Sequence, residues 1–193
     1  MQRPPERIEL PSGVVLRRLR SDDVEALQAV IDVSREHLRP FMPWADQDHE
    51  TTAAFIAKAS DGWEAGASFA YAVTEPEGSG GERVLGGCGL HRRGGPDSLE
   101  IGYWLRPDAV GRGVMTAAAG ALTAAAFTID GVTVVEIRCD AANHRSAAIA
   151  RRLGYRHVGD EDHDPEAPGE IGRRQTWACV DPAVVVGAAV PPP

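Results

Sequence analysis

The chain has 193 residues, of which 43% are hydrophobic and 25% charged, and its formal net charge is -8. This length and composition are typical of one soluble globular domain and exclude a disordered or fibrous chain. The negative charge and the scattered arginines argue against a nucleic-acid partner, because binding along a phosphate backbone needs clustered Lys and Arg.

The first half of the chain alternates strand and helix patterns. Residues 1–12 are interpreted as a flexible lead, and GVVLRRLR has the β-branched content of a strand. Ser21-Asp22-Asp23 then supplies an N-cap and early acids for a helix to about His37. The segment HLRPFMPWAD is predicted to be a structured loop, and a helix follows from Glu50 to about Ala65.

Three strands, FAYAVTE, RVLGGCGLHRR and SLEIGYWL, predict an antiparallel meander. A helical pattern then begins at Gly111 and is followed by the strand VTVVEIRCD. We next expect a helix from about His144 to Leu153 and two strands, near 155–159 and 173–180. The fold class is therefore mixed α/β, with residues 13–181 as one domain and residues 182–193 as a proline-rich flexible tail.

The cysteines Cys88, Cys139 and Cys179 are odd in number and lie in apolar, strand-like contexts without a C-x-x-C spacing. We expect reduced core thiols rather than disulfides or zinc ligands. The start MQRPPERIEL has no apolar run typical of a signal peptide, and VVVGAAV is too short to span a bilayer. We therefore expect a cytoplasmic protein with no membrane partner.

The stretch AVGRGVMTAA places Gly111 and Gly113 around Arg112 at the start of a helix. Glycines there allow successive backbone N–H groups to converge, and the helix dipole favours an anion such as a pyrophosphate. The stretch lacks the Gly-Lys-Ser/Thr of a Walker loop, and Thr116 stands where the dinucleotide fingerprint has its third glycine. A turn that merely connects strand to helix is the alternative interpretation of this stretch alone.

About thirty residues later the chain reads NHRSAAIARRLGYRHVG. Together with EIGYWL and the glycine loop, this order resembles the GNAT acetyltransferases, and specifically their RimJ/RimL-like branch, which acetylates protein N-terminal and related amines. LRPFMPWAD also resembles the Pro- and Trp-containing loop of that branch. The resemblance covers Val14 to about Val180 and implies a GNAT fold, with about seven strands, a splayed central parallel pair and about four helices.

The resemblance also implies acetyl-CoA as the donor substrate; the histidine and cysteine spacings predict no metal. It assigns the pyrophosphate to the loop and first helical turn, and the pantetheine arm to Trp104 and Leu105, with Asn143 contacting the arm from the opposite side. The pyrophosphate residues would be Gly111, Arg112, Gly113, Val114, Met115 and Thr116. The chain departs from the family pattern at Val110 and Met115, which matters little where backbone N–H groups do the binding.

Alternation along SLEIGYWL places Glu100, Gly102 and Trp104 on one face of a central strand, and Tyr103 on the other. Burial there would raise the pKa of Glu100 toward the range useful for a base. Because related enzymes use a glutamate in this region, we assign Glu100 as the general base that takes the proton of the attacking amine. A structural glutamate paired with an arginine or a backbone group is the alternative.

The tyrosine that many GNAT enzymes use as the acid for the CoA thiolate is missing, because its place holds Ala150. Ser146 resembles the serine used for this purpose in the RimL-like branch, although it is equally interpreted as a helix cap. Tyr155 is expected in the core. His91 and His144 are isolated and show no metal-binding spacing, which favours solvated or locally bonded histidines.

Acceptor specificity is expected from the loops 38–48 and 160–170. The second carries six acidic residues and no Lys or Arg, which favours either attraction of a cationic amine or a plain solvated loop. The acceptor would be a peptide N-terminus or a small-molecule amine. Two functions remain in view: an acetyl-CoA-dependent N-acetyltransferase, and a non-catalytic acyl-CoA-binding module on the same scaffold. The sequence leaves open a longer acyl donor and a homodimer.

Overall fold

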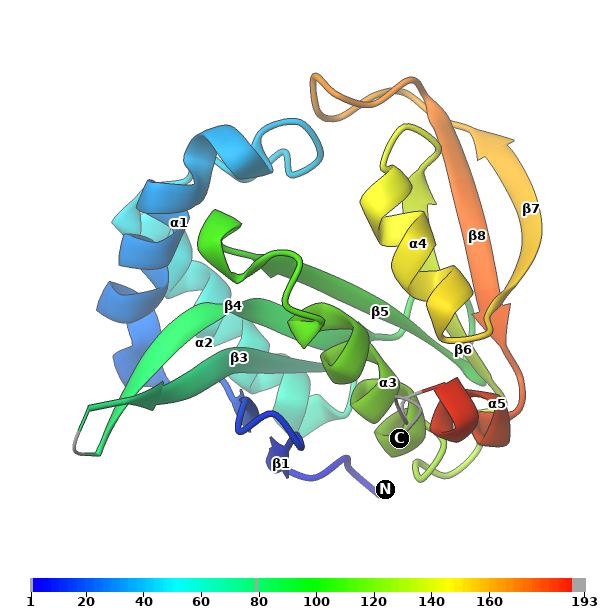
Figure 1. Cartoon of the computed structure of the whole chain (residues 1–193), viewed down its shortest axis with the longest axis horizontal. Helices are drawn as coiled ribbons and strands as arrows, with labels where there is room; N and C mark the ends of the chain where they lie inside the picture. Colours follow the sequence, from blue (N-terminus) through cyan, green and yellow to red (C-terminus); the bar gives the residue numbers. More distant parts are fainter. Residues whose placement is uncertain (1, 79, 189–193) are drawn as a thin grey trace.

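A computed structural model describes residues 2–78 and 80–188 (Figure 1). Its centre is an eight-stranded sheet with the order β1-β2-β3-β4-β5-β6-β8-β7. The strands are β1 (Arg7–Glu9), β2 (Val15–Arg18), β3 (Ser68–Glu77), β4 (Gly81–His91), β5 (Ser98–Leu105), β6 (Val134–Asp140), β7 (Arg156–Asp162) and β8 (Arg173–Cys179). The mixed α/β class and all seven predicted strands are confirmed, and β1 is an additional edge strand.

The helices connect these strands and cover both faces of the sheet (Figure 1). They are α1 (Val24–Leu38), α2 (His49–Ala65), α3 (Val114–Ala126), α4 (His144–Arg152) and α5 (Pro182–Ala188), with short 3-10 turns η1 (Ser21–Asp23) and η2 (Pro107–Ala109). One apolar cluster joins α1 and α2 to β3 and β4. A larger cluster includes residues of α3, α4 and α5 and the opposite sheet face. The sheet is thus the middle layer of three.

Strands β5 and β6 form a parallel pair, which the expected splay requires. Their register is Ser98↔Val134, Leu99↔Val135 and Glu100↔Glu136, and no pairing follows beyond it. On its other side β5 stays paired with β4 as far as Leu105, and β6 stays paired with β8. The two strands therefore part immediately after Glu100, and the edge of β5 that faces β6 is left without a ladder partner from there on.

The two ends of the chain differ from the sequence-based expectation. Residues 7–9 of the expected flexible lead pair with β2 as strand β1. Residues 182–188 of the expected tail form helix α5, in which Val185 is buried. Gly120 and Gly154 leave the space that this helix fills, since a Cβ atom on Gly154 would lie 2.3 Å from Val184 Cγ1. Residues 189–193 lie outside the described part.

The three cysteines carry free thiols and are buried, at positions in or beside the core. Tyr155 is buried as expected, with its hydroxyl 2.6 Å from Thr123 Oγ1. Among the described helices, none combines the length and the apolar composition needed to cross a membrane.

Candidate active site

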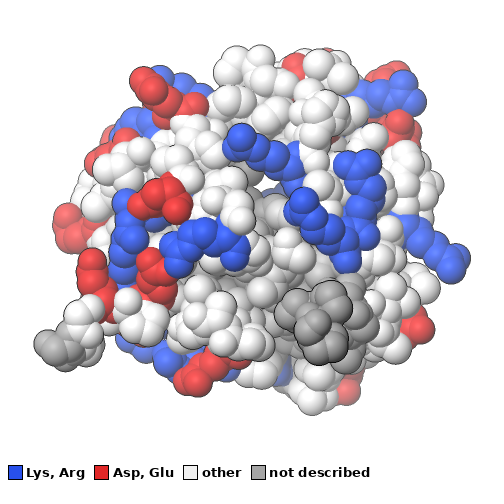
Figure 2. Space-filling view, viewed as in Figure 1, with Lys and Arg blue, Asp and Glu red and all other residues white. Residues whose placement is uncertain are grey.

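A cavity of about 2260 Å³ occupies the gap where β5 and β6 part. It is lined by the glycine loop, by α4, and by the loops that follow α1 and β7. Figure 2 shows a hollow in the middle of one face of the molecule, with blue Lys and Arg side chains on either side of it. All of the sequence-predicted site residues line this one cavity: Glu100, Trp104, Leu105, Gly111, Arg112, Gly113, Val114, Met115, Thr116, Asn143 and Ser146.

The glycine loop leaves a series of backbone donors free at the start of α3. Gly111 and Gly113 have φ values of +81° and +75°, a region that side chains with a Cβ atom disfavour. Gly113 is the N-cap residue, and no side chain caps the helix. From Gly111 to Thr116, no backbone N–H group donates a hydrogen bond to another described residue. Free amides at a helix N-terminus form a binding site for an anion.

The arginines near the glycine loop differ in whether a carboxylate neutralises their charge. Arg112 makes an ion pair with Glu75, which also pairs with Arg83, so its charge is already engaged at the rim. Arg145 and Arg152 of α4 line the cavity, and neither has an ion-pair partner among the described residues. The sequence analysis did not single out these two arginines, whose position on the cavity side depends on how α4 packs.

Glu100 lies at the point where the parallel strands part, and it is only 9% exposed. Its carboxylate accepts a hydrogen bond of 3.2 Å from Arg93 Nη1 and lies 3.8 Å from Arg138 Nε. Burial raises the pKa of Glu100 above its ordinary value, while the two arginines oppose that shift. A buried carboxylate with a raised pKa, open to a cavity, is suited to exchanging a proton there.

Trp104 and Asn143 each have a local structural partner. The indole ring of Trp104 lies against Gly87, where a Cβ atom would be 2.8 Å from Nε1, and meets Trp44 edge to face at 5.4 Å. The side chain of Leu105 is part of the core. Asn143 caps α4 by accepting the Ser146 backbone N–H at 3.2 Å. Trp104 and Leu105 belong to the part of β5 that has no pairing with β6, and Asn143 lines the same cavity.

Ser146 is not the helix cap, because Asn143 occupies that position. The hydroxyl of Ser146 lies 2.9 Å from the hydroxyl of Tyr103. Burial raises the pKa of Tyr103, although the Ser146 hydrogen bond opposes that shift, so the phenol remains protonated. The sequence analysis missed Tyr103, even though strand alternation already placed it on the face opposite Glu100.

Residues 160–170, expected to form an acidic loop, are only partly a loop. Asp160, Glu161 and Asp162 belong to β7, and Arg173 and Arg174 of the neighbouring strand pair with the first two. The remaining acids lie in the arm that we define as residues 163–172. There the Glu170 carboxylate accepts the backbone N–H groups of residues 166 and 167. These internal contacts weaken the expectation that the segment attracts cations.

Asp140 holds the base of the arm. Its buried carboxylate accepts the backbone N–H groups of Ile171, Gly172 and Arg173 at 3.0–3.2 Å, and His163 Nε2 lies 3.3 Å away. Burial by itself raises the pKa of Asp140, but these hydrogen bonds outweigh it and hold the pKa below its ordinary value. The arm is thereby fixed to the end of β6.

The tip of the arm reaches across to the opposite side of the cavity. Gly169 N donates to Pro40 O at 2.8 Å, and a Cβ atom on Gly169 would lie 2.5 Å from that oxygen. In Figure 1 the β7–β8 segment (orange) and the loop after α1 (blue) approach each other at the top of the view. Because both segments line the cavity, their contact closes a bridge over it. We call this contact the Pro40–Gly169 bridge.

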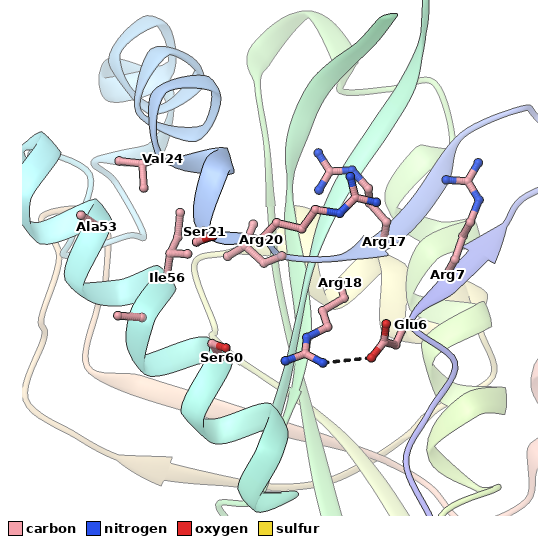
Figure 3. Close-up of a pocket in the computed structure, with 12 residues that line it drawn as sticks. Glu6, Arg7, Arg17, Arg18, Arg20, Ser21, Val24, Ala53, Ile56 and Ser60 are labelled. Atoms are coloured by element: carbon pink, nitrogen blue, oxygen red, sulfur yellow. Dashed lines mark hydrogen bonds and ion pairs between the residues drawn. The ribbon is translucent and has the colours of Figure 1, made fainter. Parts of the chain in front are cut away.

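A second cavity, of about 610 Å³, lies between β2, η1 and α2. Arg7, Arg17, Arg18 and Arg20 line it, and Figure 3 shows the ion pair between Arg18 and Glu6. Arg17 is buried and pairs with Asp23 at 2.7 Å and with Glu82 at 2.6 Å. These ion pairs link β2 to its neighbours, so we interpret this cluster as structural.

The described residues contain no group of three or more His, Cys, Asp or Glu side chains placed to hold a metal ion. The search of curated protein sequences gave no match.

Solved structures share the fold at low sequence identity. RimL, a ribosomal L7/L12 alpha-N-protein acetyltransferase in complex with coenzyme A, is 20% identical with a TM-score of 0.82, covering 92% of this chain and 99% of that one. The microcin C7 self-immunity acetyltransferase MccE, in complex with acetyl-CoA and AMP, is 18% identical with a TM-score of 0.81, over 92% and 97%. Mycobacterium smegmatis RimJ, in complex with CoA-disulfide, is 21% identical with a TM-score of 0.76, over 94% and 92%.

A family model described as the acetyltransferase (GNAT) domain matches residues 14–156. This match covers most of the chain and includes Glu100, the glycine loop and Ser146. Its range includes strand β5, which parts from β6 after Glu100, and the free backbone amides at the start of α3. The chain therefore belongs to the acetyltransferase (GNAT) domain family.

Proposed function

We propose that this protein transfers an acetyl group from acetyl-CoA to a primary amine, with a protein N-terminus as the preferred acceptor class. The observation that carries the proposal is the position of Glu100, which lies where β5 and β6 part and shares one cavity with the free amides of the glycine loop. A donor thioester and an acceptor amine have to meet beside a base, and this cavity offers one place for both.

The donor would bind along the gap between β5 and β6. Its pyrophosphate would accept the free N–H groups of residues 111–116, and Arg145 and Arg152 would balance the charge of its phosphates. The amide groups of the pantetheine arm would form hydrogen bonds with the unpaired backbone edge of β5 beside Trp104. Asn143 would contact the arm from the opposite side. Solved relatives with coenzyme A or acetyl-CoA support this assignment.

In the transfer, the amine nitrogen forms a bond to the thioester carbon and the carbon–sulfur bond then breaks. The proton lost from nitrogen passes to Glu100, whose raised pKa favours its uptake. The departing thiolate takes a proton from the Ser146 hydroxyl, which Tyr103 supports at 2.9 Å. The tyrosine missing from the α4 pattern would thus be replaced by one from β5. Each catalytic group returns to its starting state by exchange with solvent.

The assignment of a protein N-terminus rests on what similar proteins act on. RimL is described as an alpha-N-protein acetyltransferase of ribosomal L7/L12, and a Vibrio fischeri structure is a ribosomal-protein-S5-alanine acetyltransferase with 16% identity and a TM-score of 0.78. We extend that acceptor class to this chain and expect the reaction to take place in the cytoplasm.

Calorimetric titration of acetyl-CoA into the wild type and into Gly113→Glu tests the donor site first. The side chain of Gly113→Glu would place a carboxylate at the anion site and strain a backbone with φ of +75°, so we expect binding to the wild type alone. Mass spectrometry of peptides with Ser, Ala or Met at the N-terminus then tests transfer. Binding without transfer to any amine would favour the acyl-CoA-binding module, and no binding would contradict both functions.

A further inference from the structure

His91 of β4 lies directly opposite Glu100 of β5 in the antiparallel register. Residues opposite each other in such a pair point to the same face of the sheet. Both residues line the large cavity, on the face where α1 and the loop after it lie. The histidine that looked isolated in the sequence is therefore a cross-strand neighbour of the proposed base.

Two glycines give the imidazole its position. A Cβ atom on Gly89 would lie 3.3 Å from His91 Nε2, and one on Gly102 would lie 3.6 Å from the same atom. The ring therefore lies over the backbone of both strands, in space that larger residues would fill. At the other end of the same face, Trp104 lies over Gly87 in the same way. Two flat rings thus line the cavity on the sheet face that carries Glu100.

The ring nitrogens of His91 make no hydrogen bond to any described residue, although the side chain is partly buried. Burial, assisted by the positive charge of Arg93, lowers the pKa of His91 to about 4. The ring is therefore neutral at neutral pH and offers one lone pair and one N–H to whatever enters the cavity. By contrast, the ring nitrogens of His49, His157 and His163 each lie within hydrogen-bonding distance of a carboxylate or carbonyl oxygen.

We propose that His91 binds the acceptor amine, accepting one of its N–H groups so that the nitrogen lone pair turns toward the thioester carbon. This inference rests on the proposed transfer function and adds an acceptor-binding residue to it. A neutral ring suits this role, because it accepts a hydrogen bond from an amine without repelling an arriving ammonium group. The proton itself goes to Glu100, as in the transfer described above.

The charged groups around His91 fit this assignment. Arg93 follows the end of β4 by two residues and makes an ion pair with Glu100. From the neighbouring elements, Lys58 of α2, Glu36 and His37 of α1, and Arg145 of α4 line the same cavity. Burial and the charge of Arg145 lower the pKa of His37 as well. None of these groups makes a hydrogen bond to the His91 ring, so the ring remains open to a ligand.

Variants of His91 test the proposal through the acceptor. In His91→Leu, we expect the KM for the best peptide acceptor to rise about three- to tenfold, the loss expected for one hydrogen bond. The Kd for acetyl-CoA should be unchanged. His91→Gln keeps a donor and an acceptor and should recover most of the loss. His49→Leu removes a surface histidine that pairs with Glu25 and serves as the matched control.

A second measurement does not depend on turnover. The Cε1–H signal of His91, assigned by its absence in His91→Gln, should shift when a Ser-initiated peptide is titrated into the protein saturated with coenzyme A. The His49 signal should stay unchanged. A KM for His91→Leu equal to that of the wild type, or a His91 signal that no peptide moves, would overturn the proposal. Acetyl-CoA binding without any acetylated peptide would instead contradict the transfer function.

Discussion

The hydroxyl of Tyr103 lies 2.9 Å from Ser146 Oγ, so a side chain from the middle of the sheet reaches the first turn of α4. Tyr103 and Glu100 lie on opposite faces of the same strand, three residues apart. The proposed acid pair and the proposed base are therefore on the two sides of β5, and the gap beside β5 connects them. The donor thioester would lie in that gap.

A double-mutant cycle tests whether Tyr103 acts through Ser146. We expect Ser146→Ala to lower kcat, because a positioned acid contributes about 10²- to 10⁴-fold. Tyr103→Phe should lower kcat less, and the double variant should be no slower than Ser146→Ala, since the two hydroxyls form one unit. The Kd for acetyl-CoA is the control. Strictly additive losses would show that the two residues act separately.

Glu100→Gln should reduce kcat/KM by about 10²- to 10⁴-fold while leaving the Kd for acetyl-CoA unchanged, because it removes the base and keeps the shape. A small effect on kcat/KM would leave Glu100 with a structural role only.

The pH profile offers a separate test of the charge environment of Glu100. A base works only when ionised, so activity should fall as the pH drops through its raised pKa, at a pH above the usual value of 4.5. The positive charge of Arg93 lowers the pKa of Glu100 and so opposes the effect of burial. Arg93→Ala removes that charge, so the pKa of Glu100 should rise and the acid limb of kcat/KM should move to higher pH. Arg20→Ala, at an exposed position away from the large cavity, is the control. An acid limb that stays in place in Arg93→Ala would count against Glu100 as the titrating group.

The Pro40–Gly169 bridge is tested by adding a side chain where none fits. In Gly169→Val the new Cβ atom would meet Pro40 O at 2.5 Å, so the bridge should open. We expect a higher KM for the acceptor and an unchanged Kd for acetyl-CoA. Gly159→Val is the matched control, because a Cβ atom there meets nothing within 4 Å. If both variants kept the wild-type KM, the bridge would have no part in acceptor binding.

Asp140 should make the stability of the protein depend on pH. Its pKa is lowered in the folded state, so its contribution is present above the unfolded-state pKa and is lost as the pH falls through the folded-state value. Asp140→Asn should cost about 1–3 kcal/mol near neutral pH, because three backbone N–H groups lose a charged acceptor. Urea unfolding at pH 7 and pH 3 measures both effects, and the difference between wild type and variant should shrink at the lower pH.

Local patterns were sufficient for most of the fold. Alternation along SLEIGYWL correctly placed Glu100 and Tyr103 on opposite faces, and the glycines of AVGRGVMTAA correctly indicated free amides at a helix start. Such features depend on neighbouring residues and on backbone conformation, which a sequence carries directly. The short end segments were misjudged, because β1 and α5 are stabilised by the surfaces on which they pack and have little pattern of their own.

The sequence by itself determined the family, the face on which Glu100 lies and the loop that offers its amides. Only the tertiary structure decided which distant groups meet: His91 beside Glu100, Tyr103 against Ser146, Asp140 beneath the arm, and Gly169 against Pro40. The physical reason is that strand register, helix packing and loop closure bring together residues far apart in the chain. Local sequence patterns cannot predict those contacts, because each contact depends on the arrangement of the whole sheet and its covering helices.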